Sequence, residues 1–167
     1  MSKLNYLIIH CTATPKGREV SSADIIKWHT APKPEGRGWR KVGYSDIIHL
    51  DGTLENLTPF NQDGRVEGWE ITNGVKGLNQ ESRHVVYVGG VSKNGYNAED
   101  TRTCEQKESL KAYVKYMVLR HPHIKVAGHN QFAAKACPSF DVPNWLYNEV
   151  GLSKENIYDP KSSLGAS

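Results

Sequence analysis

The sequence predicts a single α/β domain in which helices flank a central mixed β-sheet. Its 167 residues match the length of one domain. Short apolar runs typical of buried strands alternate with segments of helical spacing, which is the order expected of an α/β protein. An Asp51-Gly52 pair between two strand-like runs predicts an antiparallel hairpin, so the sheet should be mixed. We place the domain at residues 1–152 and expect residues 153–167, which lack apolar periodicity, to form a flexible tail.

The N-terminal part of the chain predicts a strand followed by a helix. Residues 4–9 (LNYLII) form an apolar run typical of a buried strand, and His10 and Cys11 follow at its carboxyl end. Residues 23–29 have mixed helical spacing and follow two serines that suit a helix N-cap, so they predict a short amphipathic helix.

The hairpin and a long loop come next. Residues 44–50 and 53–57 predict the two strands that the Asp51-Gly52 turn connects. Residues 58–82 show no clear periodicity. A loop of that length in a small domain usually borders a functional site.

The C-terminal half predicts two strands and two helices. Residues 84–88 (HVVYV) are a buried strand. Residues 103–121 carry one apolar face and begin with a capping box, so they predict the longest helix. Residues 124–127 predict a short strand that leads to His129, and residues 141–147 predict a final helix capped by Asp141.

Composition excludes several classes of protein. The formal net charge is +3 and the pI is near 8.7, so the chain lacks the dense basic character of most nucleic-acid binders. No apolar run approaches the ~20 residues of a membrane span, which predicts no membrane insertion. The N-terminus lacks a secretory apolar region, so we expect no signal peptide and synthesis in the cytoplasm. Three cysteines are too few for a disulfide scaffold, and an odd number cannot all pair within one chain.

Two histidines and one cysteine form a candidate metal set. His10 and His129 each follow a strand-like run, at the sheet edge where ligands bind in open sheets, and Cys137 lies in the loop after His129. These are ligand types that zinc prefers, and three protein ligands leave a position open for water in catalytic sites. Asp141 suits a helix cap better than a fourth ligand. We expect the remaining thiols to be structural, with Cys11 in the core and Cys104 half-buried at a helix start, and the other histidines to be packing or surface residues: His29, His49, His84, His121 and His123.

Several motifs carry a resemblance to a known family. They are LIIHCTAT (7–14), the GW…VGY run (38–44), IIHLDGTLE (47–55), GLNQES (77–82), VYVGG (86–90) and, most specifically, GHNQFAAKACPSFD (128–141). Across residues 4–148 the chain resembles the zinc-dependent N-acetylmuramoyl-L-alanine amidases, and more closely the small bacteriophage amidases called phage lysozymes, which are relatives of peptidoglycan recognition proteins.

The resemblance implies a fold, an activity and a set of site residues. The fold would be a mixed sheet with surrounding helices and a groove for the glycan-peptide strand. The activity would be hydrolysis of the amide between N-acetylmuramic acid and L-alanine in peptidoglycan. The family's Zn²⁺ ligands fall on His10, His129 and Cys137, its catalytic tyrosine on Tyr44 and its catalytic lysine on Lys135.

The chemistry of amide hydrolysis agrees with these residue types. Zinc lowers the pKa of bound water from 15.7 to about 7 and polarises a carbonyl. An ammonium two residues before Cys137, on Lys135, would stabilise the oxyanion by ~3 kcal/mol if it is preorganised. The hydroxyl of Tyr44 would orient the water or the carbonyl, or transfer a proton.

Two segments depart from the family pattern. Many relatives have a histidine directly after the Gly-Tyr pair, where this chain has Ser45 and Asp46, and many have one before the G-x-N stretch, where this chain has residues 73–75. We expect both segments to line the groove, so the departures bear on the preference for a peptide stem. An alternative for Asp46 is a strand residue turned to solvent.

We expect a monomeric lysis enzyme of phage or prophage type that reaches the cell wall through a holin or similar release route. Two alternatives remain open. One is a module that binds peptidoglycan without cutting it, although non-catalytic relatives typically lose the cysteine ligand that this chain keeps. The other is a regulator that acts by binding another protein.

Overall fold

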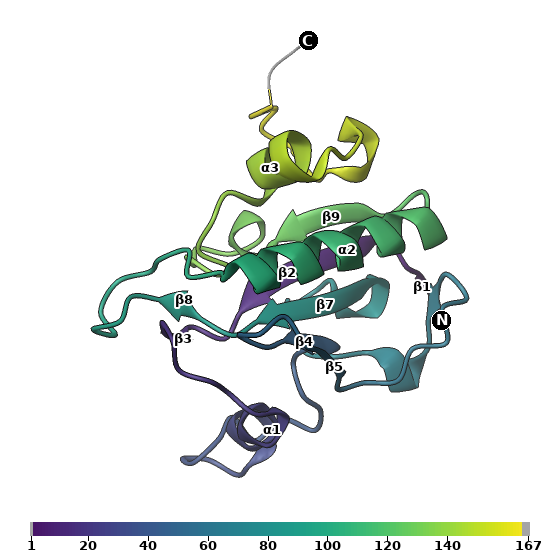
Figure 1. The fold of residues 1–167 in the computed structure, drawn as a ribbon. Coiled ribbons are helices and arrows are strands. Elements are labelled where there is room, and N and C mark those ends of the chain that lie inside the picture. Colours follow the sequence, from purple (N-terminus) through teal and green to yellow (C-terminus); the bar gives the residue numbers. More distant parts are fainter. Residues whose placement is uncertain (1, 165–167) are drawn as a thin grey trace.

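A computed structural model describes residues 2–164 of the chain. Its centre is a five-stranded mixed sheet with the strand order β5-β4-β7-β2-β9, which confirms the predicted fold class (Figure 1). The strands of this sheet are β2 (Tyr6–Cys11), β4 (Asp46–Ile48), β5 (Leu54–Asn56), β7 (Ser82–Tyr87) and β9 (Lys125–Gly128). Within this sheet, β4 and β5 pair in antiparallel fashion across the predicted Asp51-Gly52 turn, and the other three described strand pairs are parallel.

Two small two-stranded sheets lie beside the central one. In one, β1 (Ser2–Lys3) pairs with β6 (Arg65–Val66), and in the other, β3 (Thr14–Pro15) pairs with β8 (Gly90–Val91).

The helices form where the local signals predict them. Helix α1 (Ser22–Thr30) begins with a capping box, and so does α2 (Cys104–Arg120). Helix α3 (Val142–Trp145) is capped by Asp141 and continues as a π-helical turn. The shorter helical turns are η1 (Gly68–Glu70), η2 (Asn79–Glu81), η3 (His129–Gln131), η4 (Leu146–Val150) and η5 (Lys154–Asn156).

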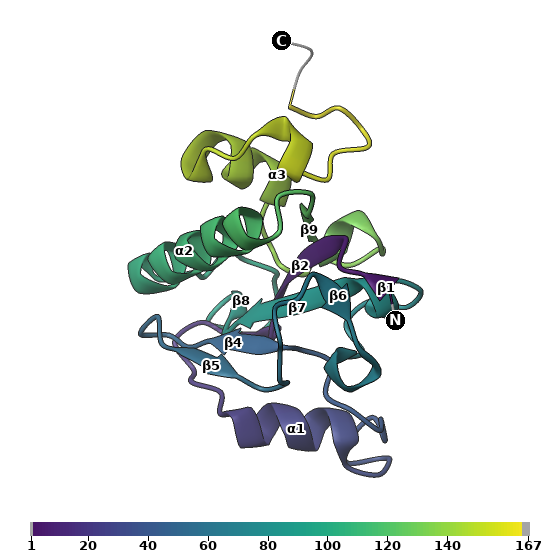
Figure 2. The ribbon, with the colours of Figure 1, turned by 90° about the vertical axis from the view of Figure 1, so that its right-hand side faces the viewer.

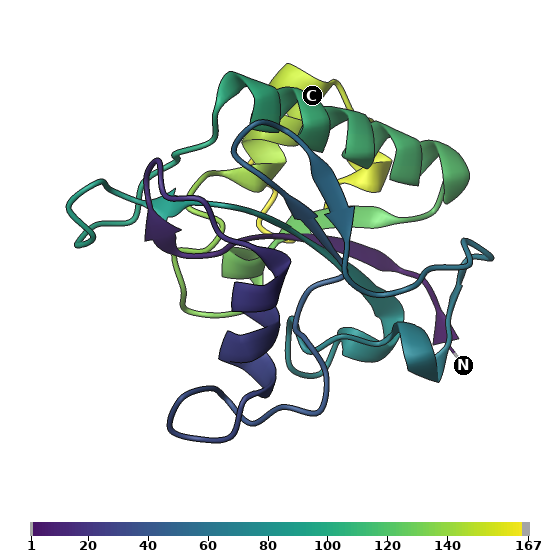
Figure 3. The ribbon, with the colours of Figure 1, turned by 60° about the horizontal axis from the view of Figure 1, so that its bottom comes forward.

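The helices cover the sheet in layers. Helices α2 and α3 lie on one side of the sheet and α1 lies on the other (Figure 2). Figure 3 shows α1 crossing the sheet on the side away from α2. Because both faces are covered, the central strands β2 and β7 are almost entirely buried, as parallel strands usually are.

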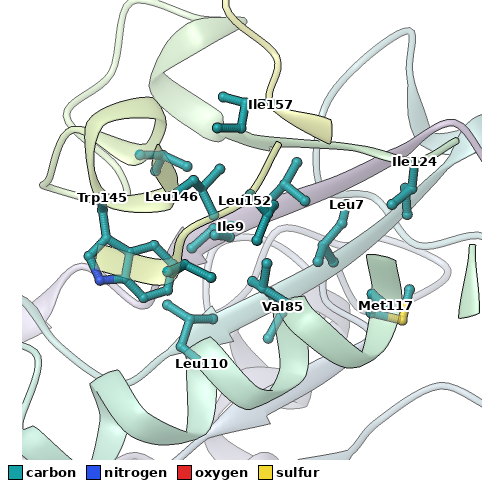
Figure 4. Close-up of a cluster of buried hydrophobic side chains, with 14 of the residues drawn as sticks. Leu7, Ile9, Val85, Leu110, Met117, Ile124, Trp145, Leu146, Leu152 and Ile157 are labelled. Carbon is teal, nitrogen blue, oxygen red and sulfur yellow. The ribbon is translucent and has the colours of Figure 1, made fainter. Parts of the chain in front are cut away.

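The main core fills the space between the sheet and helices α2 and α3. Strand residues with odd numbers in β2 and β7 point into it, as the alternation of side chains requires. Figure 4 shows this cluster, which includes Leu7, Ile9, Val85, Leu110, Met117, Ile124, Trp145, Leu146, Leu152 and Ile157. A smaller cluster lies under α1 and consists of Val20, Ile25, Ile47, Val86 and Val88.

The prediction of a flexible tail over 153–167 is wrong for most of that segment. Ile157 is 3% exposed, belongs to the main core and forms a parallel bridge with Val126. Tyr158 stacks on Phe132 with a centroid distance of 4.7 Å. Isolated apolar residues without helical or strand periodicity therefore dock at the edge of the sheet. Residues 165–167 lie outside the described part.

Across residues 2–164, no helix has the length and apolar character needed to cross a lipid bilayer.

Candidate metal centre

The three predicted metal ligands meet at one edge of the central sheet. His10 lies in β2, His129 directly follows β9, and Cys137 lies in the next loop. Because β2 and β9 are parallel neighbours, their carboxyl ends meet at the same edge. One ligand atom from each of these residues lies within 4.8 Å of the other two.

The spacing of the three residues suits a tetrahedral metal ion. His10 Nδ1 lies 3.9 Å from Cys137 Sγ, and the His10 and His129 rings are 4.7 Å apart between centroids. Tetrahedral zinc with its usual Zn–N and Zn–S bond lengths separates the nitrogen and the sulfur by about 3.6 Å. Two imidazoles and a thiolate are also a donor set that favours zinc over magnesium or calcium. The residues present therefore fit a zinc ion.

The electrostatic surroundings keep both imidazoles neutral. Burial lowers the pKa of His10 well below its usual value of 6.5, and the neighbouring histidines lower it further. Burial and the charge of Lys135 also lower the pKa of His129. Neutral imidazole is the form that binds metals, so both rings are ready to act as ligands at neutral pH.

Opposing interactions act on the protonation of the Cys137 thiol. Its hydrogen bond with the Cys11 side chain and its burial raise the pKa of the Cys137 thiol. The backbone N–H of Cys11 donates to Cys137 Sγ at 3.2 Å, an interaction that favours the thiolate. A divalent cation deprotonates a coordinating thiol, and this backbone donor would then stabilise the ligand.

Tyr44 and Lys135 line the same groove as His10 and His129. The Tyr44 ring lies 5.1 Å from the His10 ring between centroids. Burial and the nearby Cys137 raise the pKa of the Tyr44 hydroxyl, so it carries its proton at neutral pH. The Lys135 side chain is exposed, and its positive charge acts on His10 and His129.

The other predicted candidates have structural roles, with one correction. Cys11 is 3% exposed and joins the main core, as predicted from strand alternation, although its backbone amide reaches the site. Asp141 accepts a hydrogen bond from the Asn144 backbone and caps α3. Cys104 was predicted to be half-buried, which is wrong, because it is the first residue of α2 and is exposed.

The prediction that Ser45 and Asp46 line the groove is also wrong. Ser45 is 1% exposed, and its hydroxyl accepts a hydrogen bond from the His84 backbone. Asp46 is neither in the groove nor turned to solvent, because it forms a buried ion pair with Arg83 on the α2 side of the sheet. Its place in β4 gives it the same orientation as Ile48, which belongs to the main core.

His84 is a site residue that the sequence analysis missed. It is fully buried, as a packing residue would be, but its Nδ1 lies 2.8 Å from Nε2 of His10. The two residues are 74 positions apart in the chain. Only the register of β2 against β7 puts both rings on the same face, and no local signal gives that register.

The groove around the ligands has a volume of about 660 Å³. The long loop expected to border a functional site supplies one wall, through residues 73–79. Three cationic side chains line the groove: Arg37, Lys76 and Lys135. Among the described residues that line it, there is no carboxylate, so the groove favours an anionic ligand.

Comparisons with known proteins identify the family of the chain. The family model described as N-acetylmuramoyl-L-alanine amidase matches residues 1–140. The endolysin of Enterobacteria phage K11 is 34% identical over 138 residues, which cover 83% of this chain and 82% of the relative. The endolysin of Escherichia phage T7 is 32% identical over 139 residues, which cover 83% of each chain.

Solved structures share the fold at lower identity. The Ph2119 endolysin from the Thermus scotoductus MAT2119 bacteriophage superposes with a TM-score of 0.66 at 21% identity, covering 92% of this chain and 88% of that one. A structure of tracheal cytotoxin bound to the ectodomain complex of peptidoglycan recognition proteins LCa and LCx gives a TM-score of 0.64 at 19% identity, covering 92% and 86%.

Proposed function

The chain belongs to the N-acetylmuramoyl-L-alanine amidase family, and from this premise we propose that His10, His129 and Cys137 hold the zinc ion of a peptidoglycan amidase. As a member of this family with endolysin relatives, the chain is a hydrolase that cuts the amide between N-acetylmuramic acid and L-alanine. The observation that carries the assignment of the ligands is the meeting of two imidazoles and a thiol within 4.8 Å at the end of β2 and β9.

Zinc, when bound, would polarise the scissile carbonyl and activate a water molecule at neutral pH. The protein contributes the rest of the chemistry. Tyr44 carries its proton at neutral pH, so its hydroxyl donates a hydrogen bond to the carbonyl oxygen of the substrate. This contact would grow stronger as negative charge develops on that oxygen.

Lys135 supplies positive charge at the open side of the groove. Amide hydrolysis passes through a tetrahedral intermediate with a negative oxygen, and an ammonium held nearby stabilises it. The exposure of Lys135 leaves its ammonium free to approach a substrate in the groove. Its charge also disfavours protonation of His129, which keeps that imidazole available as a ligand.

The walls of the groove suit a short anionic peptide attached to a sugar. The peptide stem of peptidoglycan carries carboxylates, and Arg37 and Lys76 place positive charge along its path. The Arg37 guanidinium lies 4.9 Å from the centroid of the Trp39 ring, and Trp39 offers an apolar face for a sugar or an alanine methyl group.

We further propose that the enzyme works as a monomer and takes part in phage-type lysis after release through a holin. Support for a single subunit comes from the groove, whose ligands, proposed catalytic residues and cationic walls all belong to one chain. Support for a role in lysis comes from the phage endolysins that it resembles over most of its length.

Mass spectrometry of digested sacculi tests the proposal. Purified sacculi are incubated with the wild-type enzyme, with and without a zinc chelator, and with two matched variants, Cys137→Ala and Cys104→Ala. Wild type and Cys104→Ala should release stem peptides with a free L-alanine amino group. Chelator and Cys137→Ala should each abolish that product and bound zinc.

Two outcomes would count against the assignment. Cleavage retained by Cys137→Ala would show that this thiol is not a ligand. Zinc and sacculus binding by the wild type without any cleaved amide would instead favour the module that binds peptidoglycan without cutting it.

A further inference from the structure

Two side chains behind His10 extend the metal centre into the protein. The His10 ring is 1% exposed, and its Nε2 lies 2.8 Å from Nδ1 of His84. The other ring nitrogen of His84, Nε2, lies 3.0 Å from Oδ1 of Asn79. A continuous hydrogen-bonded chain therefore connects a proposed zinc ligand with η2 and the loop that forms a wall of the groove.

The donors and acceptors along this series of hydrogen bonds can be assigned from its outer end, at Asn79. Oδ1 of Asn79 lies 3.0 Å from the backbone nitrogen of Gly74 and 2.9 Å from that of Val75. A backbone N–H can only donate, so the side-chain atom that faces both amides is the acceptor oxygen. The third group at this oxygen, His84 Nε2, must therefore be a donor.

The proton positions on both rings follow in turn. The His84 ring is fully buried, and its hydrogen-bond partners Asn79 and His10 carry no negative charge that would stabilise an imidazolium. The ring is therefore neutral, and its Nδ1 is an acceptor once Nε2 carries the proton. His10 Nε2 must then donate to His84. The remaining nitrogen of His10, Nδ1, keeps its lone pair, and it is this nitrogen that lies 3.9 Å from Cys137 Sγ.

The backbone around His84 holds its ring in place. A Cβ atom on Gly74 would lie 2.3 Å from His84 Nδ1, so only glycine allows the loop to pack this closely against the ring. On the strand side, the backbone N–H of His84 donates to Ser45 Oγ. The imidazole is thus clamped between the loop and the sheet.

We propose that His84 and Asn79 are positioning residues that fix His10 as its Nε2–H tautomer and so present Nδ1 to the metal. This inference rests on the proposed function, because it takes His10 as a zinc ligand. Groups that hydrogen-bond the far nitrogen of a metal-bound histidine typically change metal affinity 10–100-fold when they are lost. His84 is fully buried and does not line the groove, so it acts through His10. Asn79 lines the groove wall, and its side chain reaches His10 through His84.

The first test measures the tautomer in the metal-free protein. Nitrogen-15 NMR of labelled histidine distinguishes a protonated from an unprotonated ring nitrogen. The expected result is a proton on Nε2 of both His10 and His84 at neutral pH. A proton on Nδ1 of His10 in the wild type would overturn the inference, and this measurement depends on no variant.

The second test compares two variants of similar shape. His84→Leu removes the acceptor, whereas His84→Asn places an amide oxygen close to the position of Nδ1. Zinc affinity, measured by competition with a chromogenic chelator, should fall about 10–100-fold in His84→Leu and stay within about threefold of the wild type in His84→Asn. His121→Phe, which alters a buried histidine that packs on Phe60 outside the groove, is the control and should leave affinity unchanged.

The outcomes separate this inference from the proposed function. A wild-type protein that binds no zinc would overturn the proposed function, while the tautomer measurement would still decide the direction of the hydrogen bonds. Normal zinc binding by the wild type with equal affinities in His84→Leu and His84→Asn would overturn the positioning role alone.

Discussion

Arg83 and His84 are neighbours in β7, and their side chains lie on opposite faces of the sheet, where they make different kinds of interaction. Arg83 points toward α2 and forms a buried ion pair with Asp46 at 3.0 Å. The Tyr113 hydroxyl donates to the same carboxylate at 2.6 Å, and the Phe60 ring covers the guanidinium. Every charge in this cluster has a partner within it.

His84 points the other way and joins a neutral chain. Its ring connects Asn79 to His10, and His10 presents its other nitrogen to the groove. The side chain of Arg83 is thus held by a buried counter-charge, whereas the side chain of His84 belongs to a neutral hydrogen-bonded chain that leads to the groove. We therefore expect substitutions in the Arg83 cluster to lower the free energy of unfolding. Substitutions in the groove should lower catalytic activity instead.

The largest expected effect is a loss of stability when the ion pair between Asp46 and Arg83 is broken. Asp46→Ala leaves Arg83 buried without its counter-charge, and removal of one partner from a buried pair typically lowers the free energy of unfolding by about 3–5 kcal/mol. Urea unfolding of the wild type and the variant measures the change. The activity of each folded molecule should remain the same.

A surface pair provides the control for this prediction. Lys16 and Glu99 lie 3.9 Å apart with exposed side chains, so Glu99→Ala should change stability by less than about 1 kcal/mol. Equal losses in Asp46→Ala and Glu99→Ala would contradict the view of the Arg83 cluster as a structural centre.

The second largest expected effect is a fall in kcat when a cationic side chain of the groove is removed. Lys135→Met removes the charge that stabilises the oxyanion, so kcat should fall by about 100-fold, equivalent to about 3 kcal/mol. Stability should be unaffected because the side chain is exposed. Turnover of a soluble muropeptide measures the effect, and Lys107→Met on α2 is the control. A loss confined to KM would assign Lys135 to substrate binding instead.

A smaller loss is expected from Tyr44→Phe. The substitution keeps the ring beside His10 and removes only the hydroxyl, so it deletes one hydrogen bond to a developing charge, worth about 2 kcal/mol or about 30-fold in kcat. The same muropeptide assay applies, with Tyr116→Phe on the exposed side of α2 as the control. Unchanged kcat would mean that the ring alone, as packing for His10, explains the position of Tyr44.

The smallest effect is a dependence of stability on pH. The folded pKa of His84 is about 3, below the unfolded value of ~6.5, so the unfolded chain takes up the proton first as the pH falls. The stabilising contribution is therefore complete above about pH 6.5 and is lost as the pH falls toward 3. We expect the metal-free protein to lose about 1 kcal/mol per pH unit from this group, measured by urea unfolding between about pH 7 and pH 5.

The variant His84→Leu tests the origin of that slope. It should remove the contribution of His84, so that the variant depends less steeply on pH than the wild type. His10, His29 and His129, whose pKa values burial also lowers, should leave a residual slope of the same sign. Identical slopes in both proteins would show that His84 is not the group responsible.

The parts of this molecule that sequence could predict are those with local causes. The capping boxes at Ser21 and Thr103 mark the starts of α1 and α2, and the Asp51-Gly52 pair marks the hairpin. His10 and His129 were identifiable because each directly follows an apolar run that is typical of a strand. These signals lie within a few residues of the feature that they predict.

The parts that escaped prediction depend on contacts between distant segments. The pairing of His10 with His84 and of Asp46 with Arg83 follows from strand register, which no short stretch of sequence specifies. The docking of Ile157 against Val126 is of the same kind. Their individual residues looked ordinary because the partner, and not the residue, gives each its role.

The separation of the proposed ligands along the chain has a consequence during synthesis. His10 and Cys137 are 127 residues apart, and β2 gains β9 as its neighbour only after residues 125–128 have been added. A nascent chain that has emerged as far as β7 holds one ligand of three and an incomplete sheet. Translation itself therefore delays the hydrolytic activity, and no truncated product that stops before Cys137 can assemble the proposed centre.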